Sequence, residues 1–403
     1  MFKYISFFIR NGFAKITSFI LSLIIHRSSK IILLTCSPLQ SDKFLHNSKY
    51  LYLYLENNKN LNYIPVWICN SNQMRQSLHA YGFNNVFTSN SLYGIYYILK
   101  AKYWFTDFQF LDTCKKYLFG SSVRINLWHG IPQKKIQFDD DSSYGFYHKL
   151  NKFVQIIYNT LRFNNDSYYV VNGEYEKECF KTAFLVSKDN LPILGSPRLD
   201  VLLNDIPNST VFMEEDFKNI KSMYDEGKKI FIYMPTFRDT GVDISGWLKS
   251  DKLKQFLEDN NTVLVCKLHP FDKNSLDFEL DKSFYKMDCD SDVYPILKYT
   301  DALITDYSSV AFDYLLLDKP IIYHVPDLQE YQDTCRGFYM PYEDFAVGEK
   351  TENNSEIITA MQNVIDGVDN YKEQRKALRD RMFKYHDGKN CERVVEWIRS
   401  LDK

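Results

Sequence analysis

The chain has 403 residues, of which 45% are hydrophobic, 16% aromatic and 25% charged, and its formal net charge is −2. This composition excludes a largely disordered chain, and the charge lacks the basic excess of a dedicated nucleic-acid binder, so we expect no nucleic-acid partner. Because single hydrophobic cores seldom grow past roughly 250–300 residues, the length favours two domains.

Residues 1–27 predict an amphipathic helix. One side of this helix carries, at the helical spacing, Ile5, Ile9, Phe13, Ile16, Ile20 and Leu23. The charged residues Arg10 and Lys15 disfavour a membrane-spanning helix, whereas a helix in the membrane interface can turn a basic side towards anionic lipid. We therefore expect peripheral attachment to a membrane surface. The alternative is a helix packed on the protein's own core.

Residues 28–205 alternate short apolar runs with amphipathic helical stretches. The predicted strands are Ile31–Cys36, Pro65–Cys69, Val86–Thr88, Tyr103–Thr106, Ile125–Trp128, Tyr168–Val171 and Pro192–Leu194. Strands that alternate with helices are typical of parallel sheets built from βαβ units. This region therefore predicts a first Rossmann-like domain.

The same pattern restarts after a polar break at Leu203–Ser209 and fills residues 206–385. The predicted strands there are Lys229–Met234, Thr262–Leu268, Ala302–Thr305 and Pro320–Val325. Residues 386–403 predict a C-terminal helix. The sequence thus predicts an α/β protein with two Rossmann-like domains, whose ligands we expect at the carboxyl ends of the strands.

The eight cysteines are scattered and form no CxxC pair. A chain of this length with such spacing is no disulfide scaffold, and we expect a reducing compartment. Cys266 and His269 form a lone CxxH without a second ligand pair, so we expect no zinc site.

The segment Asn126–Ile136 reads NLWHGIPQKKI and places a histidine after a predicted strand. The ordinary pKa of a histidine suits His129 to general-base work near neutral pH, and Lys134 adds positive charge close by. The alternative is that His129 only forms hydrogen bonds with the backbone of a turn and has no catalytic role.

Two predicted strands in the second half end in cationic residues. Arg238 follows a strand in MPTFRD, while Lys267 and His269 end another in CKLHP. An arginine fork matches phosphate oxygens, and side chains two apart in a strand share one face. Ion pairs with carboxylates are the alternative.

The densest segment passes from a strand into a helix at Asp306-Tyr307-Ser308-Ser309. Because a helix N-terminus carries free N–H groups and partial positive charge, Ser308 and Ser309 suit a diphosphate. Asp306 would repel phosphate and instead suits a hydroxyl or the orientation of a cation, and Asp313 lies one turn into the helix. Simple helix capping is the alternative.

Six segments together resemble the CDP-glycerol glycerophosphotransferases, which include teichoic-acid primases and polymerases and related capsule polymerases. They read NLWHGIPQKKI, GSPRLD, MPTFRD, CKLHP, LITDYSSVAFDYLLLDKPIIYHVPDLQEY and RGFYMPYED. The resemblance runs from about residue 30 to 390. It departs at Ile131–Lys134, where the family has Thr-Pro-Leu-Lys, and at Phe345–Asn353, where a PGP-like turn is usual.

The resemblance implies a GT-B fold with the active site between its two domains and a CDP-alditol donor bound mainly by the second. It implies catalytic roles for His129 and His269. The expected substrate contacts are Lys134, Arg238, Lys267, Asp306, Ser308, Ser309 and Asp313. It also implies no metal, no cofactor and peripheral attachment to the cytoplasmic face of the membrane.

The expected reaction is transfer of an alditol phosphate, glycerol phosphate foremost, from the CDP-alditol to a hydroxyl of a lipid-linked primer or surface polymer, with release of CMP. One alternative is a GT-B glycosyltransferase that uses a nucleotide sugar, in one variant with a metal at a DxD site formed by Asp288-Cys289-Asp290 or by Asp290-Ser291-Asp292. Another is a non-catalytic, membrane-docked partner in a surface-polymer assembly.

Overall fold

The computed structural model describes residues 2–35, 43–109, 115–161, 167–236, 238, 246–268, 282–335 and 337–402. The chain divides into two compact units, and each contains one sheet. The N-terminal unit comprises Met1–His129, Ile136–Ser209 and Phe383–Lys403. The C-terminal unit comprises Gly130–Lys135 and Thr210–Met382.

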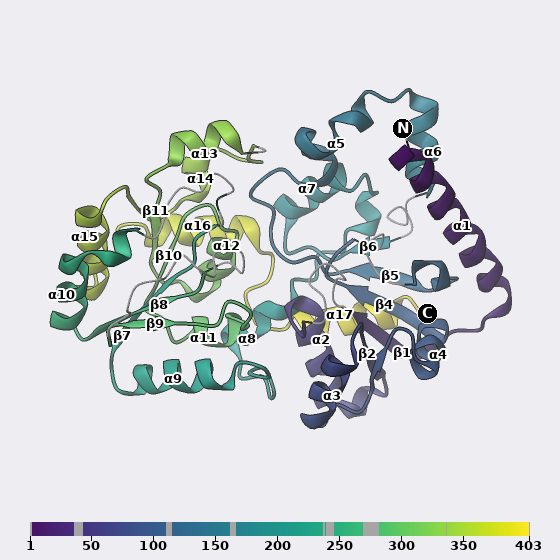
Figure 1. Ribbon diagram of the computed structural model, residues 1–403, viewed down its shortest axis with the longest axis horizontal. Helices are drawn as coiled ribbons and strands as arrows, with labels where there is room; N and C mark the ends of the chain where they lie inside the picture. Colours follow the sequence, from purple (N-terminus) through teal and green to yellow (C-terminus); the bar gives the residue numbers. More distant parts are fainter. Residues whose placement is uncertain are drawn as a thin grey trace. The chain divides into compact units, whose positions relative to one another are not determined.

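The described part of the N-terminal unit contains a parallel sheet with the strand order β3-β2-β1-β4-β5-β6 (Figure 1). The strands are β1 (Ser28–Thr35), β2 (Ile64–Cys69), β3 (Val86–Thr88), β4 (Ala101–Thr106), β5 (Val123–Asn126) and β6 (Ser167–Tyr169). The central strand β4 is buried almost throughout, and β1 is buried from Ile31 to its end at Thr35. Such continuous burial is typical of a parallel sheet covered on both faces.

The helices of the N-terminal unit lie between these strands and at both chain ends. They are α1 (Phe2–Ile24), α2 (His46–Asn57), α3 (Asn72–Ala80), α4 (Leu92–Lys100), α5 (Asp141–His148), α6 (Lys152–Leu161), α7 (Glu174–Ala183), α8 (Asp200–Leu203) and α17 (Asn390–Ser400). The last of these, α17, returns from the far end of the sequence. The Asp200 carboxylate accepts hydrogen bonds from the backbone N–H groups of Asn390 and Cys391, both at 2.8 Å, and so caps the start of α17.

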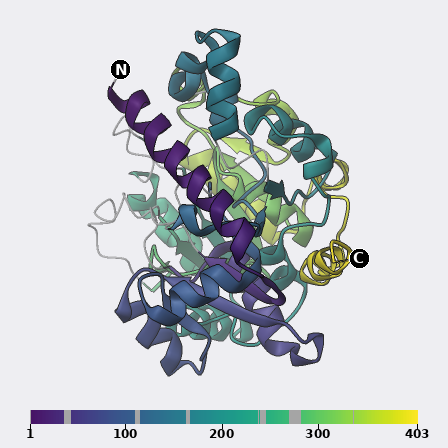
Figure 2. The ribbon, with the colours of Figure 1, turned by 90° about the vertical axis from the view of Figure 1, so that its right-hand side faces the viewer.

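Helix α1 lies on the outside of its unit (Figure 2) and presents an unusual face to the protein. Its buried side chains are the small or polar Asn11, Ala14 and Ser18. Most of its described large apolar side chains point outwards: Ile9, Phe13, Ile16, Phe19, Ile20, Leu23 and Ile24 are all more than half exposed. The helix is therefore not packed on the core by its apolar side.

The described part of the C-terminal unit contains a second parallel sheet, with the order β12-β11-β10-β7-β8-β9. The strands are β7 (Lys229–Tyr233), β8 (Thr262–Cys266), β9 (Phe284–Lys286), β10 (Ala302–Thr305), β11 (Ile321–His324) and β12 (Glu349–Thr351). The helices are α9 (Glu214–Asp225), α10 (Asp251–Asp259), α11 (Tyr294–Leu297), α12 (Val310–Tyr314), α13 (Leu328–Thr334), α14 (Tyr342–Phe345), α15 (Asn354–Ile365) and α16 (Lys372–Met382).

Both sheets confirm the predicted α/β class, and most predicted strands are present with each end within three residues of its predicted position. The predicted strand Pro192–Leu194 is wrong, because only an isolated bridge joins Ile193 to Val171. Two edge strands, β9 and β12, were not predicted. Each has three residues, and β12 reads Glu-Lys-Thr, so neither carries an apolar run.

Candidate functional site

His129 lies in a sharp turn three residues beyond β5, and not directly at a strand end. The strand ends at Asn126 because Trp128 adopts a left-handed backbone conformation, with φ of 52°. A bulky residue rarely adopts this conformation. The turn next to the candidate catalytic histidine is therefore strained and must be stabilised by its surroundings. The ring of His129 stacks on Trp128 and on Phe108, with centroid distances of 4.2 and 4.7 Å.

The geometry around His129 defines its protonation. Nδ1 lies 3.0 Å from the backbone carbonyl oxygen of Asp107. Because a carbonyl oxygen only accepts, Nδ1 carries the proton and Nε2 keeps its lone pair. Desolvation of the ring by the surrounding protein atoms and the charge of Arg198 lower the pKa of His129 to about 4. The side chain keeps access to solvent. At pH 7 the imidazole is therefore neutral, with Nε2 able to accept a proton.

Directly after His129 the chain enters the C-terminal unit. There Gly130 lies against Ser309, and a Cβ atom on Gly130 would stand 3.1 Å from the Ser309 Oγ atom. Lys134 forms an antiparallel bridge with Phe338, and its ammonium group donates to the Tyr331 hydroxyl at 2.6 Å. The predicted contact residue Lys134 is thus held in place by the segment around Tyr331.

Arg238 is buried and lies between two carboxylates. Its guanidinium group contacts Asp327 at 2.7 Å and Asp306 at 2.8 Å. Burial alone would raise the pKa of Asp327, but the Arg238 charge holds it below its usual value. The guanidinium carbon also lies 4.8 and 4.9 Å from the ring centroids of Tyr307 and Tyr331. The ion-pair alternative for Arg238 is therefore present in the structure, and its predicted contact with phosphate stays a prediction.

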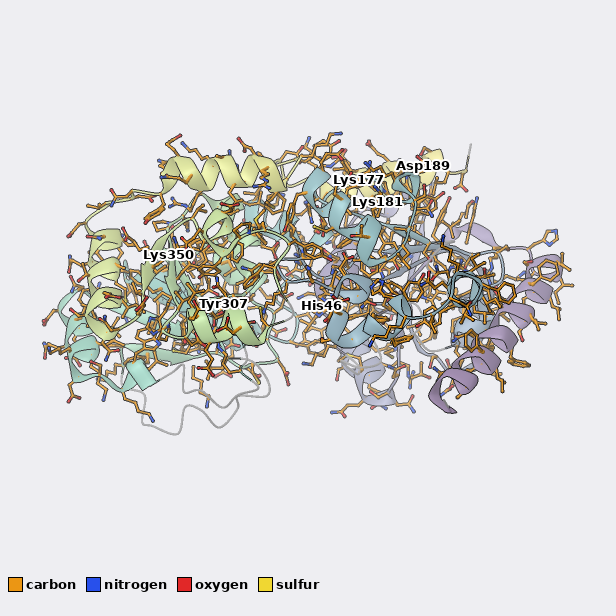
Figure 3. All side chains as sticks on the ribbon, turned by 90° about the horizontal axis from the view of Figure 1, so that it is seen from above. His46, Lys177, Lys181, Asp189, Tyr307 and Lys350 are labelled. Carbon is orange, nitrogen blue, oxygen red and sulfur yellow. The ribbon has the colours of Figure 1, made fainter. Side chains whose placement is uncertain are left out.

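Asp306 organises the loop after β10 by accepting hydrogen bonds from several directions. Besides Arg238, it accepts the backbone N–H of Thr236 at 2.9 Å and that of Tyr307. Tyr307, labelled in Figure 3, stacks on Tyr331 with a centroid distance of 3.8 Å. The structure thus places Asp306 where it orients a cation, while a substrate hydroxyl as its partner stays a prediction.

Ser308 and Ser309 precede α12, a helix of five residues. The Ser309 side chain makes no capping hydrogen bond to α12, so the capping alternative does not hold for its hydroxyl. Asp313 is buried within α12 and accepts a hydrogen bond from the Tyr294 hydroxyl at 2.6 Å. The predicted substrate contacts of all three residues stay predictions.

Lys267 follows β8 and is held by the loop after β9. Its ammonium group donates to the backbone carbonyl of Cys289 at 2.9 Å, and burial lowers the pKa of Lys267. His269, the second predicted catalytic histidine, lies outside the described residues.

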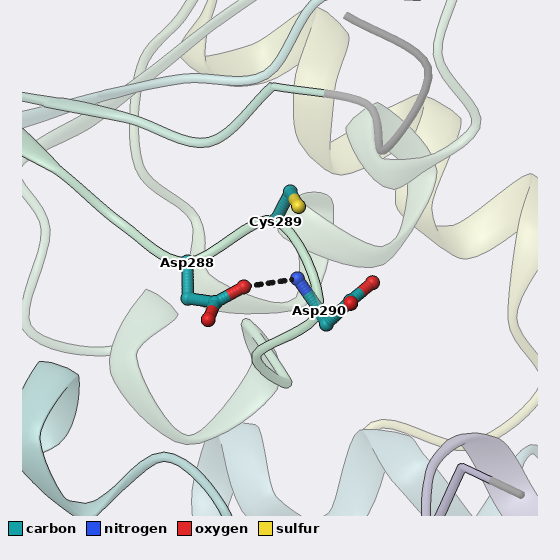
Figure 4. Close-up of side chains that lie close together, drawn as sticks. All are labelled: Asp288, Cys289 and Asp290. Carbon is teal, nitrogen blue, oxygen red and sulfur yellow. Dashed lines mark hydrogen bonds between the residues drawn. The ribbon is translucent and has the colours of Figure 1, made fainter. Parts of the chain in front are cut away.

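The loop that holds Lys267 also contains the candidate metal ligands of the alternative function, a metal-dependent glycosyltransferase. The ligand atoms of Asp288, Cys289 and Asp290 lie within 4.8 Å of one another (Figure 4). The backbone N–H of Asp290 already donates to the Asp288 carboxylate at 2.8 Å. The Lys267 ammonium bound to the same loop supplies a competing positive charge. This arrangement favours a loop in contact with solvent over a metal site.

Sequence reasoning missed several residues that organise these places. Asp107 supplies the carbonyl that fixes His129, while Asp327 and Tyr331 hold Arg238 and Lys134. No local signal marks the Asp107 carbonyl, because any residue type offers one. The segment LITDYSSVAFDYLLLDKPIIYHVPDLQEY did contain Asp327 and Tyr331, but both lie far along the chain from Arg238 and Lys134, so no local signal pairs them.

The fold and these residues define a two-sheet α/β protein with a neutral histidine in one unit and clustered cationic and hydroxyl side chains in the other. The chain belongs to the CDP-Glycerol:Poly(glycerophosphate) glycerophosphotransferase family, whose model matches residues 19–400. The predicted resemblance is therefore confirmed.

Curated relatives agree with this assignment. The chain is 33% identical over 233 residues to the teichoic acid ribitol-phosphate polymerase TarL of Staphylococcus aureus, a match that covers 56% of this chain and 40% of TarL. It spans less than half the length of TarL and TarK, the S. aureus ribitol-phosphate polymerases. It is 27% identical to the teichoic acid poly(glycerol phosphate) polymerase of Bacillus spizizenii, covering 92% of both chains.

Solved structures agree in fold. The wall teichoic acid polymerase TagF superposes with a TM-score of 0.72 at 21% identity, covering 99% of this chain and 96% of that chain. A UDP-GlcNAc 2-epimerase of Methanocaldococcus jannaschii superposes with a TM-score of 0.51 at 13% identity, covering 91% and 99%. At these identities the likeness is one of fold.

Proposed function

We propose that this protein transfers an alditol phosphate, most directly glycerol phosphate, from a CDP-alditol to a hydroxyl group of a lipid-linked primer or surface polymer. The observation that carries the proposal is the neutral His129 imidazole with an accepting Nε2, in a chain of this family. The relatives named above act on glycerol phosphate or ribitol phosphate, which supports an alditol phosphate as the group transferred.

In the proposed reaction the acceptor hydroxyl attacks the alditol-side phosphorus of the donor. The bond from that phosphorus to the bridging oxygen breaks, and the oxygen leaves with CMP. His129 Nε2 takes the proton of the attacking hydroxyl. Phosphoryl transfer of this kind depends on positioning and on neutralising charge, more than on covalent chemistry by the protein.

We assign the donor's diphosphate to the C-terminal unit. Lys134, Lys267 and His269 would offset its charge, and the Ser308 and Ser309 hydroxyls would donate hydrogen bonds. The open Ser309 hydroxyl and the fixed Lys134 support this assignment. Arg238, Asp306 and Asp313 would shape the same region. The arrangement is of the GT-B type, and the charge is met by side chains without a metal.

Helix α1 supports the further proposal that the protein attaches peripherally to the cytoplasmic face of a membrane. Among the described residues no helix combines the length and hydropathy needed to cross a bilayer. The outward apolar face of α1 instead suits insertion into the interface between headgroups and acyl chains. Nearby α6 adds the exposed Phe153 and Ile156, and Phe8 of α1 packs edge-on against Tyr158 of α6.

The test is to incubate the purified protein with CDP-glycerol, and separately with CDP-ribitol, together with a lipid-linked acceptor, and to measure CMP. We expect CMP with CDP-glycerol, dependent on the acceptor and unaffected by chelator. Activity that chelator removes and manganese restores would instead favour the metal-dependent glycosyltransferase. A complete lack of CMP with both donors would reject the proposal.

A further inference from the structure

The turn that carries His129 is held by two buried asparagines outside the predicted site. Trp128 has the left-handed φ of 52°, so the turn must be stabilised by its surroundings. The Trp128 backbone N–H donates to Asn126 Oδ1 at 2.8 Å. The Trp128 carbonyl accepts from Asn47 Nδ2, also at 2.8 Å. The backbone N–H and the backbone carbonyl of Trp128 are therefore both hydrogen-bonded to side-chain amides.

Asn47 makes three hydrogen bonds from the start of α2, and its side chain is fully buried. Its amide nitrogen also donates to the Leu127 carbonyl at 3.0 Å. Its amide oxygen accepts the backbone N–H of Arg198 at 3.0 Å. Asn47 thus ties the histidine turn to Pro197–Leu199, the short helix of the GSPRLD segment.

The same helix start also reaches the residue that sets the His129 tautomer. The backbone N–H of Ser48 donates to the Asp107 carboxylate at 3.1 Å, and the Asp107 carbonyl accepts from His129 Nδ1. The first residues of α2 therefore hold both the Trp128–His129 peptide and Asp107, whose carbonyl bonds to the His129 ring. A shift of this helix end would move both.

We propose that Asn47 is a positioning residue for the reaction, which fixes the Trp128–His129 peptide and so aims Nε2 of His129. The expected fall in kcat rests on the proposed function, whereas the expected change in the His129 tautomer does not. Asn47 touches no reacting atom and acts through His129. Replacing it should misplace the base without changing the donor contacts assigned to the C-terminal unit.

The test compares Asn47→Ala and Asn47→Asp with the wild type. The Asp variant keeps an acceptor for Arg198 but loses both donors. We expect kcat to fall roughly 100-fold in both, with KM for CDP-glycerol within about twofold. We also expect the ring ¹⁵N signals of His129 to change from the single Nδ1–H tautomer to a mixture. Asn47→Ser, which keeps one short donor, replaces any variant that fails to fold.

The matched control is Asn172→Ala. Asn172 is similarly buried in the same unit, and its side chain bonds to Glu176 and to Ser196 of the GSPRLD segment, but not to Leu127 or Trp128 of the turn. We expect a comparable loss of thermal stability with normal kcat and a normal tautomer. A wild-type tautomer and kcat in the Asn47 variants, or an equal kcat loss in Asn172→Ala, would overturn the proposal. If the wild type releases no CMP at all, the proposed function fails, while the tautomer signals still decide the role of Asn47.

Discussion

His129 owes its neutral state at pH 7 to the protein atoms that surround its ring and to the charge of Arg198. The Asp107 carbonyl accepts a hydrogen bond from Nδ1 and so fixes the proton there. Desolvation of the ring and the nearby charge of Arg198 lower the pKa of His129. A base must be unprotonated to accept a proton, and its partner atom must be exposed to the substrate. His129 meets the first condition at pH 7, and the residue is exposed to solvent.

His129→Ala is expected to abolish CMP release while leaving donor binding intact. The change removes the proposed base but none of the side chains assigned to the diphosphate. Calorimetric titration with CDP-glycerol measures the binding, and acceptor-dependent CMP formation measures turnover. A variant that still turns over would show that another group takes the proton.

The pH dependence offers an independent check on the same ring. Because the pKa of His129 is lowered to about 4, its neutral form persists down to that pH, and kcat should hold at pH 5.5. In the unfolded chain the ring titrates near its ordinary value of about 6.5. The unfolded state therefore binds the proton first, and this group's contribution to stability is lost as pH falls from about 6.5 towards about 4. An NMR titration of His129 with a midpoint near its ordinary value would contradict this account.

The buried ion cluster around Arg238 predicts a stability effect. Arg238→Met leaves Asp306 and Asp327 buried without their cation, which typically costs about 3–5 kcal/mol of unfolding free energy. Urea unfolding followed by circular dichroism measures it. The matched control is Arg379→Met, which breaks the exposed pair with Asp380 and should cost at most about 1 kcal/mol. Equal midpoints for the two variants would mean that the buried cluster is not stabilising.

At the residue scale, the sequence predicted the chemical types better than their partners. His129 and Arg238 are recognisable from local letters, but Asn47 lies 82 positions before His129 and Asp327 lies 89 positions after Arg238. Such pairings depend on how distant strands and helices come together. No local pattern encodes them.

Among the elements, α1 carries the clearest prediction. Ile16→Glu together with Ile20→Glu places charges on the exposed apolar face, where both side chains are more than half exposed. Binding to anionic phospholipid vesicles should weaken at least about tenfold because two apolar side chains can no longer insert. The melting temperature should not change. Vesicle co-sedimentation measures the binding.

The control for α1 is Val368→Glu, which charges an exposed apolar residue of the C-terminal unit. It should bind vesicles as the wild type does. Unchanged binding by the α1 variant would remove this helix from the membrane contact.

The elements themselves show what sequence patterns can and cannot predict. The central strand β10 was predicted to the residue because it is an apolar run, whereas β1 begins three residues before the predicted Ile31 because its first residues are polar. The edge strands β9 and β12 are short, and β12 is polar, so only pairing with a neighbour defines them. The strand before His129 ends early because of the left-handed Trp128, a feature that no propensity scale anticipates.

At the scale of the whole molecule, the composition and the two runs of alternating strands and helices were sufficient to predict two α/β units. They were not sufficient to predict to which unit the C-terminal segment and the short segment after His129 belong. The C-terminal α17 belongs to the N-terminal unit through Asp200, and Gly130–Lys135 belongs to the C-terminal unit through Phe338 and Ser309. These memberships come from long-range contacts.

The measurement that tests the account most directly is the analysis of both products of one reaction. Wild-type protein, CDP-glycerol and a lipid-linked acceptor are incubated, and mass spectrometry identifies the released nucleotide and the mass gained by the acceptor. We expect CMP, with one glycerol phosphate added to the acceptor for each CMP formed. Release of CDP, with glycerol added without its phosphate, would contradict attack at the alditol-side phosphorus and with it the proposed function.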